Sequence, residues 1–476
     1  MATKKDLVEA YSFSRRRLVT AFVSGAPGGR EVEPARPGRT IVGGVALAVL
    51  LMAGAAIAGV FDPKTSIDFD EPAFIIAKDK GSIYVIVDRQ PGDTEPALRP
   101  ITNVTSAQLI LGSDVEPVSV PLDEIQEHKT GPTIGILDAP ATVPEESDLI
   151  QSGWTSCTGT GLGIKTQVTE SPQVSPTPTA GFVVKRKDEF FLIAEEPAKP
   201  TRPAQAYHYR LPGNDNLNND LGVALGDEAI EVPAPWLELF DAGGSLDGRG
   251  LALDGAGERP AFDGNEQLPG QARVGDYYRD DNDRPSVITQ DGVATFSEFA
   301  LRVLINTGFG GFKPEELDVG SDAGLPTVKA PYEEAGSHWP EATLSPADGE
   351  VCALLTASHD SPPNVVIAQA PDEGSSAADV DDPATEEADV DSGHGAFVMS
   401  GGWGESADTA EPYLIDERGR AYPLVGPETT GKLGFEDDDW VRVPESWLDL
   451  FGEGVELSED AALCPPTTEK GQESCQ

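Results

Sequence analysis

The chain has 476 residues, a formal net charge of −47, 51 glycines and 40 prolines. This length suffices for about three domains, and the acidity argues against a nucleic-acid partner, because phosphates are bound by basic patches. The frequent glycines and prolines exclude long regular helices from most of the chain and favour an α+β fold dominated by strands.

An uncharged apolar stretch at residues 41–61 divides the charge of the chain. Residues 1–61 carry eight Lys and Arg against four Asp and Glu, whereas the remaining residues carry 26 basic and 77 acidic side chains. As a helix this stretch would be about 31 Å long, which matches the hydrocarbon core of a bilayer. It therefore predicts a single transmembrane helix.

The flanks of this stretch predict its orientation. Arg36 and Arg39 precede it, and short basic flanks stay in the cytoplasm. We therefore expect a single-pass protein of the cell membrane, with residues 1–39 cytoplasmic, residues 40–61 spanning the bilayer and the bulk of the chain extracytoplasmic. The alternative is a signal peptide that is cleaved among the small residues of the apolar stretch.

Residues 4–22 predict a basic amphipathic helix ahead of the membrane. Its apolar side chains at helical spacing are Leu7, Tyr11, Leu18 and Phe22, and its basic side chains include Arg15, Arg16 and Arg17. Such a helix can lie on anionic membrane lipid or dock on a partner subunit. The alternative is that its charges only fix the topology.

A repeated phrase characterises the outer part of the chain: VPAPWLELF at residues 232–240 returns as VPESWLDLF at residues 443–451. Because prolines suit the first turn of a helix, each copy predicts a short amphipathic helix that packs one face on a core. The residues of the two faces are Trp236, Leu237 and Phe240 in the first copy and Trp447, Leu448 and Phe451 in the second. Gly243 and Gly454 are placed to end these helices.

An internal duplication explains this repeat. Strand-like segments precede both helices, at residues 181–184 and 190–196 in the first copy and at residues 396–399 and 413–418 in the second. The predicted parts are a first half at residues 62–255, a second half at residues 256–460 and a tail at residues 461–476. The Gly- and Asp-rich segment around residues 242–250 is expected to join the two halves.

Each half is expected to contain two small units, each built from strands and one helix. Residues 73–88 predict two strands followed by a helix at residues 103–112, and residues 285–309 are a weaker counterpart. The acidic segment 371–393 has few large apolar residues and predicts a disordered loop in the second half. Four strand-plus-helix units in two pairs follow from this pattern.

Motif searches reveal no active site. The segment GTGLGIKT at residues 159–166 approaches a phosphate-binding loop, but Ile164 stands where a glycine should precede Lys165, which favours a glycine-rich turn before a strand. Residues 216–227 resemble a calcium loop, with Leu221 in place of its glycine. The five histidines lack zinc-site spacing. We therefore expect no catalytic residue, no metal and no cofactor.

Several motifs follow one another in a characteristic order: RRRL, GSIYVIVD, LRPITNVTSAQLILG, GPTIGILDAP, WTSC and a late VC. This order resembles the EccB family, a membrane subunit of the actinobacterial type VII (ESX) secretion machinery. The resemblance spans nearly the whole chain and is most specific at residues 81–157. The chain departs from the family in its extreme acidity, its segment 371–393 and its tail.

The resemblance implies a central β-rich core with four repeat units around a pseudo-two-fold axis, similar to a phage lysin subunit that binds cell walls. It also implies an oligomeric complex with other core membrane subunits, including an FtsK-like ATPase. The expected function is that of a structural, non-enzymatic subunit that scaffolds the extracytoplasmic face of a type VII protein secretion complex. The alternatives are a module that binds peptidoglycan and an ATP-hydrolysing subunit, an activity sometimes ascribed to the family.

The four cysteines predict two disulfides, because the extracytoplasmic compartment is oxidising. Cys157 and Cys352 occupy matching positions in the two halves, so they can meet only close to the pseudo-two-fold axis. Cys464 and Cys475 can close a local loop in the polar tail. We therefore expect the pairs Cys157–Cys352 and Cys464–Cys475, the first of which the EccB resemblance also implies. The alternative is a pair of buried free thiols.

Overall fold

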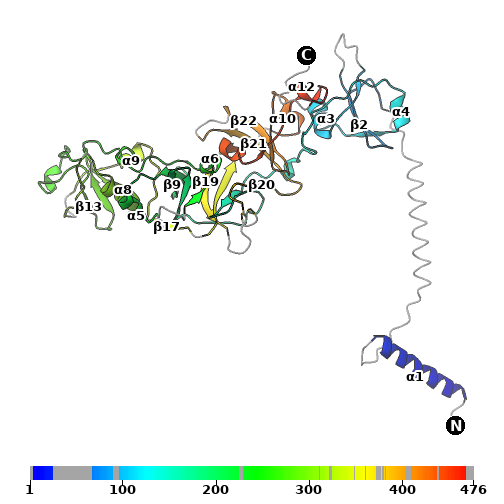
Figure 1. Ribbon diagram of the computed structural model, residues 1–476, viewed down its shortest axis with the longest axis horizontal. Coiled ribbons are helices and arrows are strands. Elements are labelled where there is room, and N and C mark those ends of the chain that lie inside the picture. Colours follow the sequence, from blue (N-terminus) through cyan, green and yellow to red (C-terminus); the bar gives the residue numbers. More distant parts are fainter. Residues whose placement is uncertain are drawn as a thin grey trace. The chain divides into compact units, whose positions relative to one another are not determined.

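The computed structural model describes residues 4–24, 67–88, 96–223, 229–309, 311–320, 324–347, 349–359, 361–370, 377, 380, 382–403, 409–436 and 439–467 (Figure 1). The chain divides into two compact units, Met1–Ser66 and Ile67–Gln476. The predicted transmembrane stretch 41–61, with Arg36 and Arg39, lies outside the described residues. In the part of the chain that is described, no helix is both long enough and apolar enough to cross a membrane.

Helix α1 (Lys4–Ser24) of the first unit forms where the basic amphipathic helix was predicted. Tyr11 and Leu18, two members of its predicted apolar face, are 73% and 69% exposed, and Arg15 is exposed as well. Both kinds of side chain are therefore accessible on this helix.

The second unit is α+β and dominated by strands, which form a central sheet and four flanking sheets among its described residues. The central sheet has the strand order β20-β6-β5-β18-β19-β7. Its strands are β5 (Trp154–Thr158), β6 (Ile164–Val168), β7 (Ser175–Pro176), β18 (Val351–Ser358), β19 (Ser361–Gln369) and β20 (Glu386–Val390). The central sheet thus combines strands from both predicted halves.

The first half of the unit also forms flanking sheets 1 and 2. The strands of sheet 1 are β1 (Ala73–Ala77), β2 (Ile83–Ile86), β3 (Leu98–Pro100) and β4 (Val118–Val120). The strands of sheet 2 are β8 (Ala180–Arg186), β9 (Glu189–Glu196), β10 (Gln205–Arg210), β11 (Ile230–Glu231) and β12 (Asp241–Ala242), and β17 (Ser345–Pro346) of the second half pairs with β8.

The second half forms flanking sheets 3 and 4. The strands of sheet 3 are β13 (Tyr277–Arg279), β14 (Pro285–Ile288), β15 (Val293–Thr295) and β16 (Thr327–Val328). The strands of sheet 4 are β21 (Ala396–Gly401), β22 (Glu411–Ile415), β23 (Arg420–Pro423), β24 (Val441–Pro444) and β25 (Gly452–Glu453).

Short helices connect these strands. They are α3 (Val104–Leu111), α4 (Leu122–Gln126), α5 (Asp215–Asp220), α6 (Ala234–Leu237), α7 (Gly248–Leu251), α8 (Glu298–Thr307), α9 (Pro331–Glu334), α10 (Thr429–Lys432), α11 (Glu445–Leu448) and α12 (Glu459–Ala462), with 3-10 turns at Glu146–Asp148 and Asn265–Gln267. Side-chain caps start the longer ones: Asn103 accepts the Ser106 N–H of α3, and Ser297 accepts the Ala300 N–H of α8.

Sheets 2 and 4 share one pattern of strand pairing. In each, three consecutive strands pair antiparallel, a short parallel strand lies beside the first, and another parallel strand lies beside the third. Sheets 1 and 3 also contain three consecutive antiparallel strands and one parallel strand each. The parallel strand is β4, beside β1, in sheet 1 and β16, beside β15, in sheet 3. Single parallel bridges, Ile101 to Ile134 and Tyr277 to Glu316, occur on the opposite edges.

Three apolar cores join the sheets in succession. One joins sheet 3 to sheet 2, a second joins sheet 2, the central sheet and sheet 4, and a third joins sheet 4 to α3 beside sheet 1. Figure 1 shows the same succession, from β13 through β9, β19 and β22 to β2. Helices α5 and α7 contact α8 at one end, and α10 and α12 contact α3 at the other. The contacts made around sheet 3 are therefore repeated around sheet 1.

The segment 242–250, which was expected to join the two halves, packs against the folded unit. It contains the last residue of β12 and most of α7, and its Leu246 is buried, as is Leu251 just after it, in the core that α8 shares. Apolar residues are sparse in this segment, but burying one leucine side chain contributes about 2 kcal/mol.

The acidic segment 371–393, predicted to be a disordered loop, contains strand β20. This strand pairs parallel with β6, and its last residue, Val390, is buried. Ala377 and Val380, earlier in the segment, are buried as well. The prediction was wrong for these residues because backbone pairing and a few small apolar side chains can order a strand even when its acidic side chains are exposed.

Gly243 and Gly454 do not end the repeated helices. Helices α6 and α11 end before Glu238 and Asp449, both in right-handed backbone conformation. Each glycine instead follows a short parallel strand, where an added Cβ would collide with the ring of Tyr209 or Tyr422. The glycines are therefore required by the close approach of an aromatic side chain.

Candidate functional site

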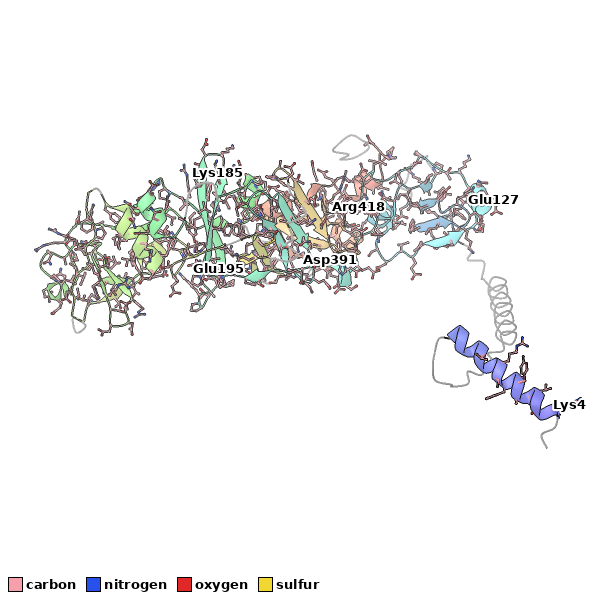
Figure 2. All side chains as sticks on the ribbon, turned by 60° about the horizontal axis from the view of Figure 1, so that its bottom comes forward. Lys4, Glu127, Lys185, Glu195, Asp391 and Arg418 are labelled. Carbon is pink, nitrogen blue, oxygen red and sulfur yellow. A yellow bond between two sulfur atoms is a disulfide. The ribbon has the colours of Figure 1, made fainter. Side chains whose placement is uncertain are left out.

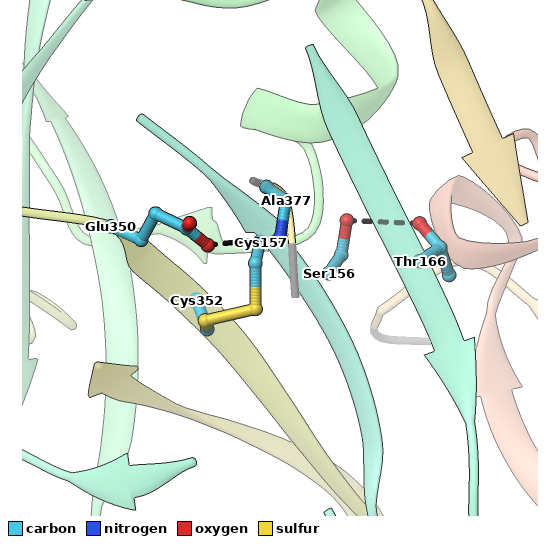
Figure 3. Close-up of a disulfide and its surroundings, with 6 residues drawn as sticks. All are labelled: Ser156, Cys157, Thr166, Glu350, Cys352 and Ala377. Atoms are coloured by element: carbon cyan, nitrogen blue, oxygen red, sulfur yellow. Dashed lines mark hydrogen bonds between the residues drawn. A yellow bond between two sulfur atoms is a disulfide. The ribbon is translucent and has the colours of Figure 1, made fainter. Parts of the chain in front are cut away.

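The centre of the second unit is the pair of strands β5 and β18. They run antiparallel, with Cys157 directly opposite Cys352 and a Cα–Cα distance of 4.0 Å, and a disulfide joins the two residues (Figure 3). On either side, Ser156 faces Ala353 and Thr158 faces Val351. The disulfide thus ties a strand of the first half to a strand of the second half.

The disulfide is shielded from solvent. Cys157 and Cys352 are both 0% exposed and pack with Ala368 and Ala377. The carboxylate of Glu350 accepts the backbone N–H of Ala377 at 3.0 Å (Figure 3). Burial raises the pKa of Glu350 although this hydrogen bond opposes the shift. A residue of the acidic segment therefore covers the disulfide.

The two repeated helices pack on this central sheet. All six residues of their predicted apolar faces lie in one core with the central strands: Trp236 and Leu237 of α6, Phe240 just after it, Trp447 and Leu448 of α11, and Phe451 just after it. Trp154 of β5 makes edge contacts with Trp447 and Phe451, at ring-centroid distances of 6.4 and 5.7 Å. The two copies of the repeated phrase thus meet in the structure.

A polar seam joins the ends of the two helices. The backbone carbonyl of Glu238 accepts hydrogen bonds from Ser446 Oγ at 2.8 Å and from Trp403 Nε1 at 3.1 Å. Beside this carbonyl is an open hollow of about 250 Å³, whose acidic lining residues are Glu238, Asp241 and Glu445. The seam therefore connects the end of α6 with α11 and with the segment that follows β21.

Lys165, in the segment that approaches a phosphate-binding loop, is already engaged. Its Nζ lies 3.1 Å from Glu387 Oε2 and forms a second ion pair with Asp389, both on β20. Burial lowers the pKa of Lys165, but the hydrogen bonds and charges of Asp389 and Glu387 outweigh it and raise the pKa. Ile164 begins β6, so the segment is a hairpin between two strands of the central sheet.

The other candidate ligand positions that the structure describes do not gather into a metal site. In the segment that resembles a calcium loop, residues 216–220 lie in helix α5, which is capped by Asn214. Within the described ranges, no three His, Cys, Asp or Glu side chains form a cluster that could hold a metal ion. Cys464 is buried and disulfide-bonded, whereas Cys475 lies outside the described residues.

A polar network at the end of β9 was missed by the sequence analysis. Glu196, 2% exposed, pairs through Oε1 with Lys199 Nζ and Arg202 Nη2, each at 2.8 Å. Its Oε2 lies 3.0 Å from His338 Nδ1, and Lys199 Nζ also lies 2.9 Å from Glu333 Oε1. Two acidic residues directly after an apolar run were the only signal for this network, and they do not identify the partners.

The neighbouring carboxylates Glu195 and Glu196 have opposite electrostatic environments (Figure 2 labels Glu195). Burial raises the pKa of Glu195, although the backbone N–H of Ile367 opposes this shift. Burial would also raise the pKa of Glu196, but hydrogen bonds from His338 and Lys199 and the charges of Lys199 and Arg202 hold it below its usual value. One residue therefore resists ionisation while the next favours it.

Fold and site together define a class of protein: a strand-dominated α+β chain in which two similarly connected sets of sheets are joined by a central disulfide. A family model described as "Type VII secretion system ESX-1, transport TM domain B" matches residues 1–468. The chain belongs to this EccB family.

Curated relatives agree with this assignment. Over 119 residues the chain is 34% identical to the "ESX-1 secretion system ATPase EccB1" of Mycolicibacterium smegmatis (strain MKD8), covering 25% of this chain and 23% of that protein. Over 155 residues it is 30% identical to the protein of that name from Mycobacterium tuberculosis (strain ATCC 25618 / H37Rv), covering 33% of this chain and 30% of that protein. The chain thus aligns with less than a third of either relative.

Solved structures share the fold. A chain in "Structure of an intact ESX-5 inner membrane complex" superposes with a TM-score of 0.59 at 21% identity, covering 100% of this chain and 98% of that one. A chain in "Structure of EccB3 dimer from the ESX-3 core complex" superposes with a TM-score of 0.56 at 19% identity, covering 82% of this chain and 100% of that one.

These names overturn one expectation. The absence of a recognisable motif predicted that the chain is not an enzyme, whereas the curated relatives are named as ATPases. The prediction was therefore wrong. Its physical weakness is that backbone amides and side chains distant in sequence, or from neighbouring subunits, can form a nucleotide site without a contiguous motif.

Proposed function

We propose that this chain is a membrane-anchored scaffold subunit on the extracytoplasmic face of a type VII secretion inner membrane complex. The observation that carries the proposal is the disulfide between Cys157 and Cys352, which joins central strands of the two halves and is fully buried. A staple at this position favours a rigid platform over two independently moving domains. Membership of the EccB family and the fold shared with ESX complexes support the same role.

The proposed topology follows from the sequence. Residues 1–39 lie in the cytoplasm, residues 40–61 cross the membrane and residues 62–476 lie outside. Helix α1 supports this arrangement, because its exposed Tyr11, Leu18 and Arg15 suit anionic lipid or a cytoplasmic partner. The proposed partners are the other core membrane subunits, including an FtsK-like ATPase.

We infer that the outer region arose by duplication and contains four repeat units around a pseudo-two-fold axis. The common pairing pattern of sheets 2 and 4 supports this inference, as does the repetition of α5 and α7 around α8 by α10 and α12 around α3. Such an axis passes between Cys157 and Cys352, where equivalent strands are adjacent.

Affinity purification after mild detergent extraction tests the scaffold role. The full chain, tagged at its N-terminus, is expected to bring down the other core membrane subunits, which mass spectrometry identifies. A Cys352→Ser variant is expected to recover fewer partners, and Cys475→Ser serves as the matched cysteine control. Recovery of the intact wild-type chain without any secretion subunit would contradict the proposal. Enrichment with peptidoglycan alone would favour the wall-binding alternative.

A second candidate function is ATP hydrolysis, which the names of the relatives favour. Lys165 is held by Glu387 and Asp389, so we expect a Lys165→Ala substitution to leave hydrolysis by the purified complex unchanged. Phosphate release, measured with wild type and variant in parallel, tests this. A loss of hydrolysis in the variant, with its unfolding midpoint retained, would instead place the nucleotide at residues 159–166.

A further inference from the structure

We propose that His338 is a pH-responsive switch at the joint between sheets 2 and 3. Protonation changes the hydrogen-bond partner of its Nδ1 atom from Arg202 to Glu196. His338 follows α9, whose Tyr332 packs in the core shared by the two sheets, as does Trp339. The Glu196 side of the joint belongs to β9 of sheet 2. A change at His338 therefore acts on the contact between the two sheets.

The geometry of one nitrogen atom carries the proposal. His338 Nδ1 lies 2.9 Å from Arg202 Nη1 and 3.0 Å from Glu196 Oε2. A guanidinium group only donates and a carboxylate only accepts, whereas Nδ1 carries either a lone pair or a hydrogen. Nδ1 can therefore bond to Arg202 when it is unprotonated, or to Glu196 when it is protonated, but never to both.

The imidazole is held in place while this exchange occurs. Its ring stacks on Tyr207 of β10 with a centroid distance of 4.6 Å and an interplanar angle of 6°. The backbone N–H of His338 donates to Gly243 O at 3.0 Å, and its carbonyl accepts from the Tyr209 hydroxyl. Because ring and backbone are both fixed, Arg202 rather than His338 has to move on protonation.

Charged groups from three segments face the switch. Glu196 of β9 attracts the imidazolium, whereas Arg202 and Lys199, on the turn after β9, repel it. Glu333 of α9 is bound to Lys199 and offsets part of that repulsion. On protonation, Arg202 keeps its bond to Glu196 Oε1 but loses His338, so one cross-link between the turn and the segment after α9 opens.

Nitrogen NMR of the full chain in detergent, with histidine labelled by ¹⁵N, tests the proposal. A His338→Gln variant assigns the resonance. At pH 8 we expect Nδ1 to be unprotonated and Nε2 to carry the hydrogen, and at pH 5 we expect both nitrogens to be protonated. A neutral imidazole with hydrogen on Nδ1 at pH 8 would overturn the proposal, because Arg202 could then not donate to it. A nitrogen that does not titrate between pH 5 and pH 8 would overturn it as well.

Hydrogen exchange of residues 199–202 supplies a second readout. In the wild type we expect exchange to be several-fold faster at pH 5 than at pH 8, after correction for the intrinsic pH dependence. In His338→Gln this difference should disappear, whereas His394→Gln, a histidine bonded to Ser392 O outside the joint, should retain it. A difference that persists in His338→Gln would show that another group controls the turn.

Discussion

Sheets 2 and 4 have the same strand pairing but differ in how they satisfy one buried tyrosine. Tyr209 and Tyr422 lie opposite Leu192 and Leu414, and each packs against a glycine. The Tyr209 hydroxyl donates to His338 O, on the segment that leads back from sheet 3, whereas the Tyr422 hydroxyl donates to Asp416 within its own hairpin, at 3.1 Å.

This difference extends to the contacts that each sheet makes with its neighbouring elements. Sheet 2 is tied to its neighbour through polar contacts of Tyr209, Glu196 and His338, in addition to apolar packing. At the other end, α12 packs Ala461 and Ala462 against α3, and Lys432 Nζ lies 2.6 Å from Glu459 Oε2. Equivalent topology therefore permits joints of different chemistry, and only the first joint contains a histidine facing a buried carboxylate among the residues described.

Removing the disulfide that joins the two halves should have the largest effect on stability. We expect Cys352→Ser to lower the free energy of unfolding by up to about 5 kcal/mol, because the disulfide closes a loop with a sequence separation of 195 residues. Chemical denaturation of the full chain without reductant measures this. Cys475→Ser is the control, and an equal or larger loss in that variant would mean that the central disulfide does not hold the halves together.

The repeated tryptophans test the equivalence of the two halves. Trp236 and Trp447 are both 0% exposed and share one core, so truncation to alanine should cost about 3–5 kcal/mol in either case. Thermal and denaturant unfolding of the two variants should give losses within about 1 kcal/mol of each other. A large loss at one site with a negligible loss at the other would contradict the proposed duplication.

Substitution of Tyr209 and of Tyr422 should distinguish a contact between sheets 2 and 3 from a contact within one hairpin of sheet 4. Tyr209→Phe removes a bond between segments and should cost about 1–3 kcal/mol, with faster hydrogen exchange around residues 337–339. Tyr422→Phe should cost a similar amount but leave that region unchanged, because its partner Asp416 lies in the same hairpin. Hydrogen exchange detected by mass spectrometry distinguishes the outcomes, and identical exchange maps for both variants would remove the distinction.

The smallest expected effect is that of Glu196→Gln on the pH dependence of stability, because this substitution removes only one carboxyl group. The folded-state pKa of Glu196 is lowered, so its stabilising contribution is present above its unfolded pKa, near 4.5, and is lost as pH falls through the folded value. Wild type should therefore lose more stability than Glu196→Gln between pH 6 and pH 3. Parallel denaturation curves that shift equally in both proteins would show that this carboxylate is not responsible.

Much of the framework could be predicted because its signals are local. The apolar runs before each repeated helix form β8, β9, β21 and β22, and the Pro-then-Trp pattern locates α6 and α11. The opposition of Cys157 and Cys352 followed from their matching positions in two halves. These features depend on short stretches of sequence or on symmetry between two of them.

The remainder depends on contacts that no local pattern encodes. Strand β20 forms in an acidic segment because β6 offers a free edge for pairing. Position 243 requires glycine because the ring of Tyr209 leaves no room for a Cβ atom. Glu196 is paired with His338, which lies 142 residues away in the chain. The spacing of residues in the sequence does not identify partners so far apart, so the polar contacts between sheets 2 and 3 could not be predicted.

The central disulfide also determines how the chain bears mechanical load. Sheets 2 and 3, with all strands from β8 to β17, lie between Cys157 and Cys352 in sequence. Tension applied between residues 67 and 467 passes across the sulfur–sulfur bond and bypasses them. About 650–700 Å of extended chain is thereby withheld from stretching, since each residue spans about 3.3–3.6 Å. Sheets 1 and 4 and the central strands β19 and β20, which lie outside this loop in the sequence, are left to bear the load. The stretch that contains the histidine joint does not bear it until the bond is reduced.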